Sequence, residues 1–399
     1  MSEWTTIRLG SVVRTNTTSY SPKEGWKYVN YLDTGNITEN VIDAIQNIDL
    51  TNEKLPSRAK RKVQIDSILY STVRPNQKHF GIIKSMPENF LVSTGFAVID
   101  VIPEKVDADY LYFWLTQNTV VEQLHAIAEQ SVSAYPSIKA SDIENLEIAL
   151  PPLTVQKTIA SILKAISDKM SHNSNINENL QQQASALFES WFVNYDPWDG
   201  EMPSAWEKAP LGTFVEIKRG GSPRPIQDFL SDSGLRWLKI SDVTSLKSPF
   251  ILEIKEHIKL EGLKKTVFLK AGELVLSNSA TPGIPKILDV DSCIHDGWLY
   301  FPKSQLSKYY LYLFFKHIRK ELVALGNGSV FTNLKTDILK AFPAVKADAD
   351  TLTAFDSIAM PLFDAMLNLD RENAHLVAMR DALLPKLMAG EIDLSEIQL

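Results

Sequence analysis

Two short clusters in the sequence have side chains that could do hydrolytic or metal chemistry. Glu216-Ile217-Lys218, downstream of Asp199, has the acidic pair and the lysine with which a nuclease could bind magnesium and position water. The triplet has no counterpart in the first half of the chain, and its pattern recurs by chance at Glu253-Ile254-Lys255. His79 and the pair His295-Asp296 lack companions at metal-ligand spacing. We therefore predict no catalytic residue and no metal site, and we expect surface or core roles for these histidines.

Sequence signals for cofactors, disulfides and membranes are missing as well. There is no GxGxxG or Walker-type phosphate loop and no Asn/Asp-Pro-Pro-aromatic tetrapeptide of an amino-methyltransferase. The single cysteine, Cys293, can form neither an internal disulfide nor a cysteine-based zinc cage. No run of about eighteen apolar residues and no signal-like N-terminus is present. These features favour a cytoplasmic protein that binds no cofactor of its own and has no contact with a membrane.

The charges are unevenly distributed along the chain, although the net charge of −7 argues at first sight against nucleic acid. Residues 1–150 carry 14 basic and 18 acidic side chains, whereas residues 206–345 carry 20 and 14. Within the first region, residues 54–78 hold seven cations and a single acid, Asp66. Since attraction to phosphate depends on local fields, both regions could bind nucleic acid. Basic loops that are simply solvated would have the same composition.

Basic and polar loops that follow strand-like runs are the best candidates for DNA contacts, although such loops are also ordinary turns. Arginine can bond guanine bidentately and asparagine can bond adenine, while lysine holds phosphates. Loops of this kind lie at residues 71–79, 218–224 and 277–283. The predicted DNA-binding residues are Lys60, Arg61, Lys62, Arg74, Asn76, Lys78, Lys218, Arg219, Arg224, Lys264, Lys265 and Asn278.

The elements that would position these loops occur twice in the chain. Trp4 followed by Leu9-Gly10-Ser11-Val12-Val13 returns as Trp206 followed by Leu211-Gly212-Thr213-Phe214-Val215, and Tyr110-Leu111-Tyr112 returns as Tyr310-Leu311-Tyr312. An ordered series of such matches predicts two similar units of roughly two hundred residues each. Each unit should mix strands and amphipathic helices. The expected strands cover residues 63–71, 92–101, 269–277 and 293–301, and the expected helices cover 110–130 and 309–325.

Each unit ends in a long helical pattern with the alternating four-three spacing of a coiled coil. Two such segments in one chain favour antiparallel pairing, which would bring Trp4 near the C-terminal tail. Pro361 should start or kink the second helix. Asn177 and Asn373 occupy matching positions, where a buried amide would fix the register and an exposed one would face water. The first seam is Ile159, Leu163, Ile166, Met170, Asn173, Asn177, Leu180, Ala184, Leu187 and Trp191, and the second is Phe355, Ala359, Leu362, Met366, Leu369, Asn373, Leu376, Arg380, Leu383 and Leu387.

Four segments in this order resemble the specificity subunits of type I restriction–modification enzymes. They are residues 149–156 (ALPPLTVQ), 185–192 (SALFESWF), 220–223 (GGSP) and 379–392 (MRDALLPKLMAGEI). The resemblance covers essentially the whole chain, and the C-terminal segment is the most specific. The second helix has AFPAV at 341–345 in place of the Pro-Pro-Leu…Gln lead-in.

The resemblance implies an α+β protein with two target recognition domains, at residues 1–150 and 196–345, each of which recognises half of a split DNA site. It implies spacer helices at 151–195 and 346–399 that set the unread spacer and dock two methyltransferase subunits. S-adenosylmethionine, ATP and magnesium would belong to these subunits and to the restriction (translocase/nuclease) subunits of the complex. The residues expected to bind partner subunits are Gln181, Gln182, Trp191, Phe192, Arg371 and Arg380.

Three other functions are compatible with parts of the sequence. A freestanding scaffold or adaptor would use the two units to bind protein, and it predicts no salt-dependent affinity for DNA. A recognition subunit of a related restriction system would differ only in its partner chains. A nuclease that uses Glu216 and Lys218 would cut DNA by itself in the presence of magnesium.

Overall fold

The computed structural model describes residues 4–131, 135–326 and 334–394, and the chain divides into two compact units. Unit 1 comprises Met1–Lys169 and Val377–Leu399, and unit 2 comprises Met170–Leu376. Both units combine helices with mixed sheets, which confirms the predicted α+β fold. Two long helices, α4 (Leu153–Phe192) and α9 (Ala349–Met388), contribute residues to both units.

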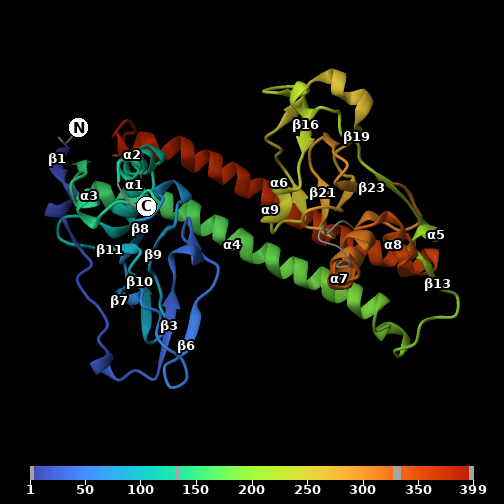
Figure 1. The fold of residues 1–399 in the computed structure, drawn as a ribbon, viewed down its shortest axis with the longest axis horizontal. Helices are drawn as coiled ribbons and strands as arrows, with labels where there is room; N and C mark the ends of the chain where they lie inside the picture. The colour runs from blue at the N-terminus through green and yellow to red at the C-terminus, as the bar shows by residue number, and fades with distance from the viewer. Residues whose placement is uncertain (1–3, 132–134, 327–333, 395–399) are drawn as a thin grey trace. The chain divides into compact units, whose positions relative to one another are not determined.

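In its described residues, unit 1 has two four-stranded sheets, two two-stranded pairs and three short α-helices before α4. Its elements before α4 are β1 (Thr5–Arg8), β2 (Val13–Thr15), β3 (Tyr28–Leu32), β4 (Ile37–Thr38), β5 (Val41–Ile42), β6 (Gln46–Asp49), β7 (Ala59–Arg61), β8 (Ile68–Ser71), β9 (Phe80–Ile82), β10 (Phe90–Ser93), β11 (Phe96–Val101), α1 (Ala108–Leu115), α2 (Asn118–Glu129), α3 (Ala140–Glu144) and β12 (Glu147–Leu150). One four-stranded sheet has the order β2-β11-β8-β9 and the other has the order β6-β3-β10-β7, and the two-stranded pairs are β1-β12 and β4-β5. Helices α1 to α3 lie at one end of the unit, and β3 and β6 lie at the other (Figure 1).

Unit 2 repeats this plan. Its elements between α4 and α9 are β13 (Glu207–Pro210), α5 (Leu211–Phe214), β14 (Val215–Arg219), β15 (Leu230–Ser231), β16 (Leu235–Leu238), α6 (Ser241–Thr244), β17 (Phe250–Ile251), β18 (His257–Ile258), β19 (Val267–Leu269), β20 (Leu274–Ser277), β21 (Pro285–Leu288), β22 (Ser292–Ile294), β23 (Trp298–Ser304), α7 (Lys308–Gly326), α8 (Thr336–Ala341) and β24 (Pro343–Lys346). The sheets have the orders β14-β23-β20-β21-β17 and β15-β18-β16-β22-β19. In Figure 1, α7 and α8 lie at the opposite end of the unit from β16.

The strand registers give a residue-by-residue correspondence between the units. Phe96 of β11 pairs with Ser71 of β8, and Trp298 of β23 pairs with Ser277 of β20. The neighbouring strand pairs, β3 with β10 and β16 with β22, are both parallel. The internal repeat seen in the sequence is therefore a repeat of structure.

The repeated Leu-Gly pair has a packing reason. A Cβ added to Gly10 would lie 3.2 Å from the Cβ of Glu144 in α3, and one added to Gly212 would lie 3.2 Å from the Cβ of Lys340 in α8. A side chain at either position would force the neighbouring helix residue to shift by a few tenths of an ångström, so glycine suits this close approach. Equivalent short helices, α3 and α8, thus pack on the Leu-Gly pair of their own unit.

Several predicted elements are shorter than expected because local turns interrupt them. Residues 63–71 form a strand only from Ile68, since Asp66 has φ +69°. Gly272, with φ +93°, separates β19 from β20. The expected helix at 110–130 divides into α1 and α2, because Thr116 Oγ1 and Gln117 Nε2 donate to the carbonyls of Phe113 and Trp114 and cap α1. The helix expected at 309–325 is confirmed as α7.

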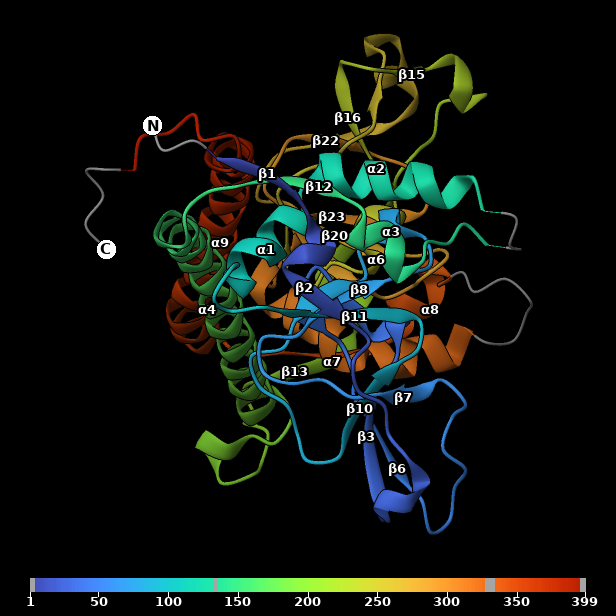
Figure 2. The ribbon, with the colours of Figure 1, turned by 90° about the vertical axis from the view of Figure 1, so that its left-hand side faces the viewer.

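The predicted four-three seam is confirmed for most of α4. Within unit 1, Ile159 and Leu163 are buried in one core with Leu384 and Leu387 of α9, and Figure 2 shows these parts of the two helices side by side. The antiparallel pairing is therefore confirmed in this unit. Trp4 also packs against this core. A ring atom of Trp4 would lie 2.9 Å from a Cβ added to Gly390, so the predicted approach of Trp4 to the C-terminal tail is confirmed.

Within unit 2, the buried face of α4 leaves the predicted seam after Ala184. Phe188 and Phe192 are buried, whereas the expected Leu187 and Trp191 are half-buried. The reason is the aromatic core of the unit: the ring of Phe192 lies 4.8 Å from that of Tyr310. In a straight α-helix the buried positions drift around the helix relative to a strict four-three spacing. This drift is expected where the helix packs on a globular core instead of a supercoiled partner.

The sequence predicts that Pro361 starts or kinks the second helix, and the prediction that it starts the helix is wrong. Helix α9 begins at Ala349 and continues through Pro361. Phe355 and Phe363, on either side of the proline, are both buried in the core of unit 2. Pro361 and Ser357 are exposed, so the carbonyl that loses its helical partner faces solvent.

A buried polar cluster joins α4 and α9 within unit 2. Asn177 is 6% exposed, which confirms the buried-amide alternative for this residue, whereas Asn373 is half-buried. Asn173, one helical turn before Asn177, is 0% exposed. Asn173 Nδ2 donates to Asn373 Oδ1 at 2.9 Å, and Asn177 Nδ2 donates to Asp370 Oδ1 at 2.7 Å. Each amide crosses from one helix to the other, so a slipped register would leave buried polar groups without partners.

Lys286 of β21 extends this cluster. It is 3% exposed, and its ammonium donates to the carbonyl of Leu246 at 2.7 Å and to that of Ser248. The Ser248 hydroxyl in turn bonds Asp370. Burial lowers the pKa of Lys286 to about 8, and Asp370 opposes this shift.

Candidate nucleic-acid interface

The loop after β8 presents cations and an amide on unit 1. Arg74 is in the left-handed region, with φ +47°, and its N–H donates to the carbonyl of Pro136. Its guanidinium lies 5.3 Å from the ring centre of Tyr135, which is 60% exposed. Asn76 is exposed in the turn that follows. A planar cation on an exposed ring is well placed to bond a base edge or a phosphate.

Lys78 closes the same loop and forms an ion pair of 2.9 Å with Glu39. The two side chains are 36% and 51% exposed, so the pair is weak and could open for a stronger anion.

The predicted residues around β7 have unequal access. Lys60 is exposed. Arg61 is half-buried, donates to the carbonyl of Thr94 at 3.4 Å and has its pKa lowered by burial, so it mainly supports the sheet. Lys62 lies 5.0 Å from the ring of Trp26 and pairs with Glu24. Of the three residues, Lys60 is the most available to phosphate.

The Glu216 and Lys218 side chains form an ion pair of 2.9 Å on β14. The hydrogen bond with Lys218 lowers the pKa of Glu216, and the same contact raises the pKa of Lys218. Across the described residues, no group of three His, Cys, Asp or Glu side chains is placed to hold a metal ion.

The loop at 219–224 is fixed to the turn between β22 and β23. Arg219 Nε donates to the carbonyl of Asp296 at 2.6 Å, and the hydroxyl of Ser222 donates to Asp296 Oδ1 at 2.6 Å. Arg224, whose side chain is 79% exposed, donates to Asp296 Oδ2 at 3.1 Å. Gly220 is required, since a Cβ there would lie 2.2 Å from the carbonyl oxygen of His295. The glycine of this loop thus has a structural reason.

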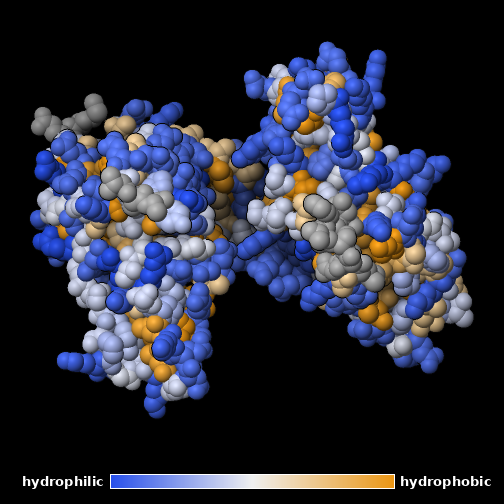
Figure 3. Space-filling model, in the orientation of Figure 1, coloured by the Kyte–Doolittle hydropathy of each residue, from blue (hydrophilic) through white to orange (hydrophobic). Residues whose placement is uncertain are grey.

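Lys264 and Lys265 are exposed in the 3₁₀ turn Leu260–Lys265, beside this loop. A Cβ on Gly221 would lie 3.0 Å from the carbonyl oxygen of Lys265. The Lys265 ammonium lies 4.9 Å from the ring of Phe229. The structure therefore brings two predicted basic segments of unit 2 together. Figure 3 shows the end of unit 2 that carries β16 covered mainly by hydrophilic side chains.

Asn278 is the predicted DNA-binding residue that the structure places in the interior. It is 1% exposed, because its N–H donates to the carbonyl of Gly297 and its carbonyl accepts from Leu334. The prediction of a base contact is wrong for Asn278. Sequence position after a strand did not distinguish this buried strand end from the exposed Ala280 that follows.

The predicted partner-binding residues also divide by exposure. Phe192 is 4% exposed inside the aromatic core, so the prediction that it binds a partner is wrong. Gln182 is exposed, while Gln181 and Trp191 are half-buried. The two arginines are engaged in ion pairs on the surface: Arg371 bonds Asp289 bidentately at 2.6 and 3.0 Å, and Arg380 bonds Asp381 at 2.8 Å.

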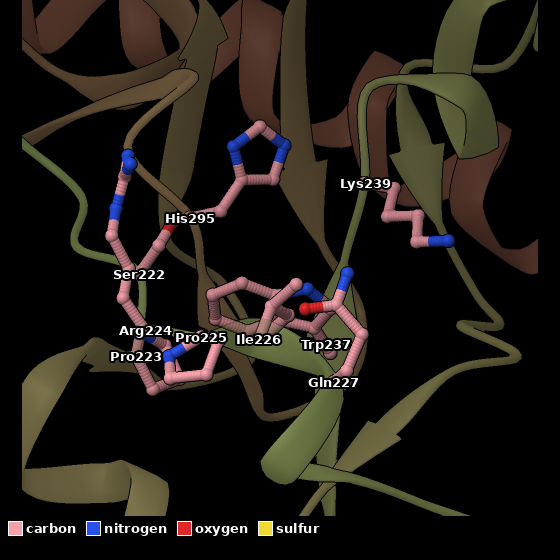
Figure 4. A pocket seen from close by; sticks show the side chains of 9 residues that line it. All are labelled: Ser222, Pro223, Arg224, Pro225, Ile226, Gln227, Trp237, Lys239 and His295. Atoms are coloured by element: carbon pink, nitrogen blue, oxygen red, sulfur yellow. The ribbon is translucent and has the colours of Figure 1, made fainter.

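Sequence reasoning missed a pocket in unit 2. It has a volume of about 660 Å³ and is lined by Ser222, Pro223, Arg224, Pro225, Ile226, Gln227, Trp237, Lys239 and His295 (Figure 4). Its indole and imidazole rings have centres 6.0 Å apart. The sequence carried two signals for it, namely the GGSP segment and the His295-Asp296 pair, but nothing in the sequence linked them.

The same place in unit 1 has different chemistry. By strand register, Tyr31 corresponds to Trp237, since they pair with Leu91 and Cys293 respectively. Two residues further along, Asp33 stands where unit 2 has Lys239, and the Tyr31 hydroxyl donates to Asp33 at 3.0 Å. Equivalent backbones thus present an acid in one unit and a cation in the other.

The loop after the central strand differs in the same way. Ala280 has φ +57° and follows β20 as Arg74 follows β8. The backbone conformation is kept, and the arginine is replaced by a side chain without charge.

Two diverged units with basic loops, joined to paired long helices, define a class of DNA-recognition protein. The sequence matches the family described as "Type I restriction modification DNA specificity domain" over residues 1–182 and 203–358, and the chain belongs to this family. Its role is therefore in DNA sequence recognition within restriction–modification.

Individual relatives agree with this assignment. The chain is 25% identical to the type I restriction enzyme HindI specificity subunit of Haemophilus influenzae, over 98% of this chain and all of that one. It is 25% identical to the MjaIX specificity subunit of Methanocaldococcus jannaschii, over 77% and 74% of the two chains. A crystal structure of a type I restriction–modification S subunit from M. genitalium has the same fold, with a TM-score of 0.60 over 96% of both chains at 15% identity.

Among the described residues, none of the helices combines the length and the apolar character that crossing a bilayer would need.

Proposed function

We propose that the chain is the DNA-recognition subunit of a type I restriction–modification complex and that it recognises a bipartite, asymmetric site. Each unit would bind one half-site. The observation that carries this proposal is the correspondence between the units: the backbone register is repeated, while Tyr31 and Asp33 in unit 1 are replaced by Trp237 and Lys239 in unit 2. Identical modules would favour a symmetric site, whereas modules with different side chains on one backbone favour two different half-sites.

The basic loops described above would supply phosphate and base contacts. On unit 1 these are Lys60, Arg74, Asn76 and Lys78, and on unit 2 they are Lys218, Arg219, Arg224, Lys264 and Lys265. Arg61 and Lys62, which pack against the sheet and against Trp26, would act mainly by holding the loop. The exposed cations suit phosphate binding in a chain whose net charge is negative, because the attraction is local.

The paired helices would set the number of base pairs between the half-sites and would dock two methyltransferase subunits. Exposed polar side chains of α4, among them Gln182, and the surface arginines Arg371 and Arg380 suit such a protein contact. The chain itself would be non-catalytic and cytoplasmic. S-adenosylmethionine, ATP and magnesium would be bound by the methyltransferase and restriction subunits.

Genome-wide mapping of methylated adenines tests this proposal. In cells that express the chain with its methyltransferase partner, we expect one methylated motif made of two different short sequences separated by a fixed unread spacer, and its loss when the gene for the chain is deleted. A continuous motif, or an unchanged methylation pattern, would contradict the proposal. Incubating the isolated chain with DNA and magnesium separates it from the nuclease alternative, which predicts cutting that depends on Glu216.

A further inference from the structure

The pocket of unit 2 is concave, and its walls are held rigidly. Trp237, which is 3% exposed, forms an aromatic wall, and Pro223 and Ile226 line the pocket with it. The loop that carries these last two residues is tied to Asp296 through Ser222 and Arg224. Figure 4 shows Gln227, Lys239 and His295 around the same opening. The pocket is thus already shaped before any ligand arrives.

His295 has one defined hydrogen-bonding role in this pocket. The N–H of Gly297 donates to its Nδ1 at 2.7 Å, so this nitrogen must accept and the ring proton of the neutral imidazole is on Nε2. The ring lies near two indoles, and its centre is 6.0 Å from that of Trp237 and 6.5 Å from that of Trp298. A protonated Nδ1 would face the Gly297 N–H, and burial also lowers the pKa of His295. The side chain therefore offers a fixed donor, Nε2–H, near neutral pH.

The charge around the opening favours an anionic ligand. Arg224 is 79% exposed, and Lys239, paired with Glu256, is 40% exposed. Arg219, Lys264 and Lys265 lie in the adjoining segments. Three acids lie nearby. Asp296 and Glu256 are engaged by Ser222, Arg224 and Lys239, and Asp242 accepts from the backbone N–H of Lys239 at 2.9 Å.

A base that remains stacked in a duplex presents only its edge in a groove and cannot enter a concave pocket. A base that has left the stack can do so, and proteins bind such bases between aromatic or apolar faces with hydrogen bonds to their polar edge. The pocket offers an apolar wall to which Trp237, Pro223 and Ile226 contribute, a fixed imidazole donor, the Gln227 amide and cations for the attached phosphate.

We propose, on the basis of the DNA-recognition function inferred above, that this pocket binds a single unstacked nucleobase from the half-site recognised by unit 2. Its ring lies against Trp237, and an acceptor on its edge takes the Nε2–H of His295. Unit 1 has Tyr31 bonded to Asp33 at the corresponding place and binds no base in this way.

The first test uses the full chain and the four deoxynucleoside 5′-monophosphates, with binding followed by saturation-transfer NMR. At least one nucleotide should bind saturably, and His295→Ala should lower its affinity at least fivefold. Lys303→Ala, which removes an exposed cation from β23, should leave the affinity unchanged. Equal competition by inorganic phosphate would show a plain anion site and would overturn the proposal, as would equal binding to the His295→Ala protein. Gln227→Ala, which removes an exposed polar side chain from the pocket lining, provides a second variant if His295→Ala fails to fold, and it should weaken nucleotide binding as well.

The second test uses duplexes that carry the mapped site, with each base pair replaced in turn by a mismatch. A mismatched base is already easier to unstack. A mismatch at one position in the half-site of unit 2 should therefore make the chain bind the duplex at least fivefold more tightly, and His295→Ala should abolish this gain. No such position in the half-site of unit 1 is expected. Tight binding to the matched duplex without any gain would overturn the pocket proposal alone, whereas absence of any duplex binding would overturn the proposed function.

Discussion

Asn173 Nδ2 lies 2.9 Å from Asn373 Oδ1, and this hydrogen bond joins α4 to α9 within unit 2. Asn373 also donates to the carbonyl of Met170 at 3.3 Å, so one amide holds two points of the facing helix. Hydrogen bonds between buried amides add little net stability, but leaving one partner unpaired is expensive. The pair therefore acts mainly on the choice of register.

Replacing one member of this pair should destabilise the chain. Asn373→Leu removes one of the two acceptors of the buried Asn173 amide, which keeps only its bond to Glu372. It also removes the hydrogen bonds that Asn373 donates to Met170 and Ser174, and we expect a loss of about 1–3 kcal/mol in the free energy of unfolding. Scanning calorimetry of the full chain measures this as a lower melting temperature. Asn175→Leu, at an exposed position on α4, is the matched control and should change little. Equal effects of the two substitutions would contradict a register role for the buried amides.

The buried ammonium of Lys286 predicts a pH dependence of stability. Its pKa is about 8 in the folded chain and has an ordinary value of 10.5, so between these pH values the unfolded chain binds more protons. Stability contributed by this group should therefore rise as pH increases from about 8 to 10.5. Lys286→Met should remove that rise, whereas Lys303→Met, at an exposed position of β23, should retain it. Chemical denaturation of the three proteins across this range measures the difference, and parallel curves for Lys286→Met and the unsubstituted chain would refute the assignment.

Single arginine substitutions should affect one half of the methylated motif at a time. Arg74→Ala in unit 1 and Arg224→Ala in unit 2 remove exposed guanidiniums on separate units. A lost bidentate base contact weakens discrimination by about 1–3 kcal/mol, or roughly 5-fold to 150-fold. Methylation mapping in cells that express each variant should show relaxed sequence in one half-site and an unchanged other half. Relaxation of both halves by either substitution would argue against independent recognition by the two units.

The salt dependence of DNA binding should show whether Lys264 and Lys265, beside the loop at 219–224, contact phosphate. If both bind phosphate, Lys264→Ala combined with Lys265→Ala should reduce the slope of log Kobs against log salt concentration by about 1.8, since each contact contributes about 0.9. Fluorescence anisotropy at several salt concentrations measures the slope. A protein-binding scaffold would show no salt-dependent affinity for DNA in the first place, and an unchanged slope in the double variant would remove these two lysines from the interface.

Lengthening both long helices should lengthen the unread spacer. Seven residues inserted after Asn175 in α4, together with seven after Arg371 in α9, preserve the four-three seam and add about 10 Å of helix. We expect a spacer longer by about three base pairs, at about 3.4 Å each, with both half-sites unchanged. Insertion in α4 alone breaks the Asn173 and Asn177 contacts and should lower the melting temperature instead. A spacer that stays constant in the double insertion would exclude a ruler role.

Sequence patterns predicted the repeat because the two units keep equivalent contacts in the same order. The Leu-Gly pairs recur because Gly10 and Gly212 each lie close to an equivalent short helix, at Glu144 and Lys340, and the spacing of Ile159, Leu163 and Ala184 follows from one buried helix face. Comparison of the two halves shows the repeated glycine even though the helix that it contacts is distant in the chain.

The failures involve contacts between distant segments. Asn278 looked like a loop residue but is a buried strand end, and Phe192 looked like a partner contact but packs on Tyr310, more than a hundred positions away. The pocket combines Ser222, Trp237 and His295 from three separate strand and loop regions. Only the tertiary fold brings these residues together, and no periodic pattern encodes them.

The close approach of Gly220 to the carbonyl of His295 has a consequence for how new DNA targets arise. Glycines, the Asp296 contacts and the buried Trp237 hold the frame of the pocket, while Lys239 and Gln227 only line it. Selection for a different target sequence can therefore exchange the lining side chains one at a time, because none of these exchanges disturbs the turns that keep the loop in place. A lineage of such proteins would diversify its specificity through a few exposed positions while its glycines stayed unchanged.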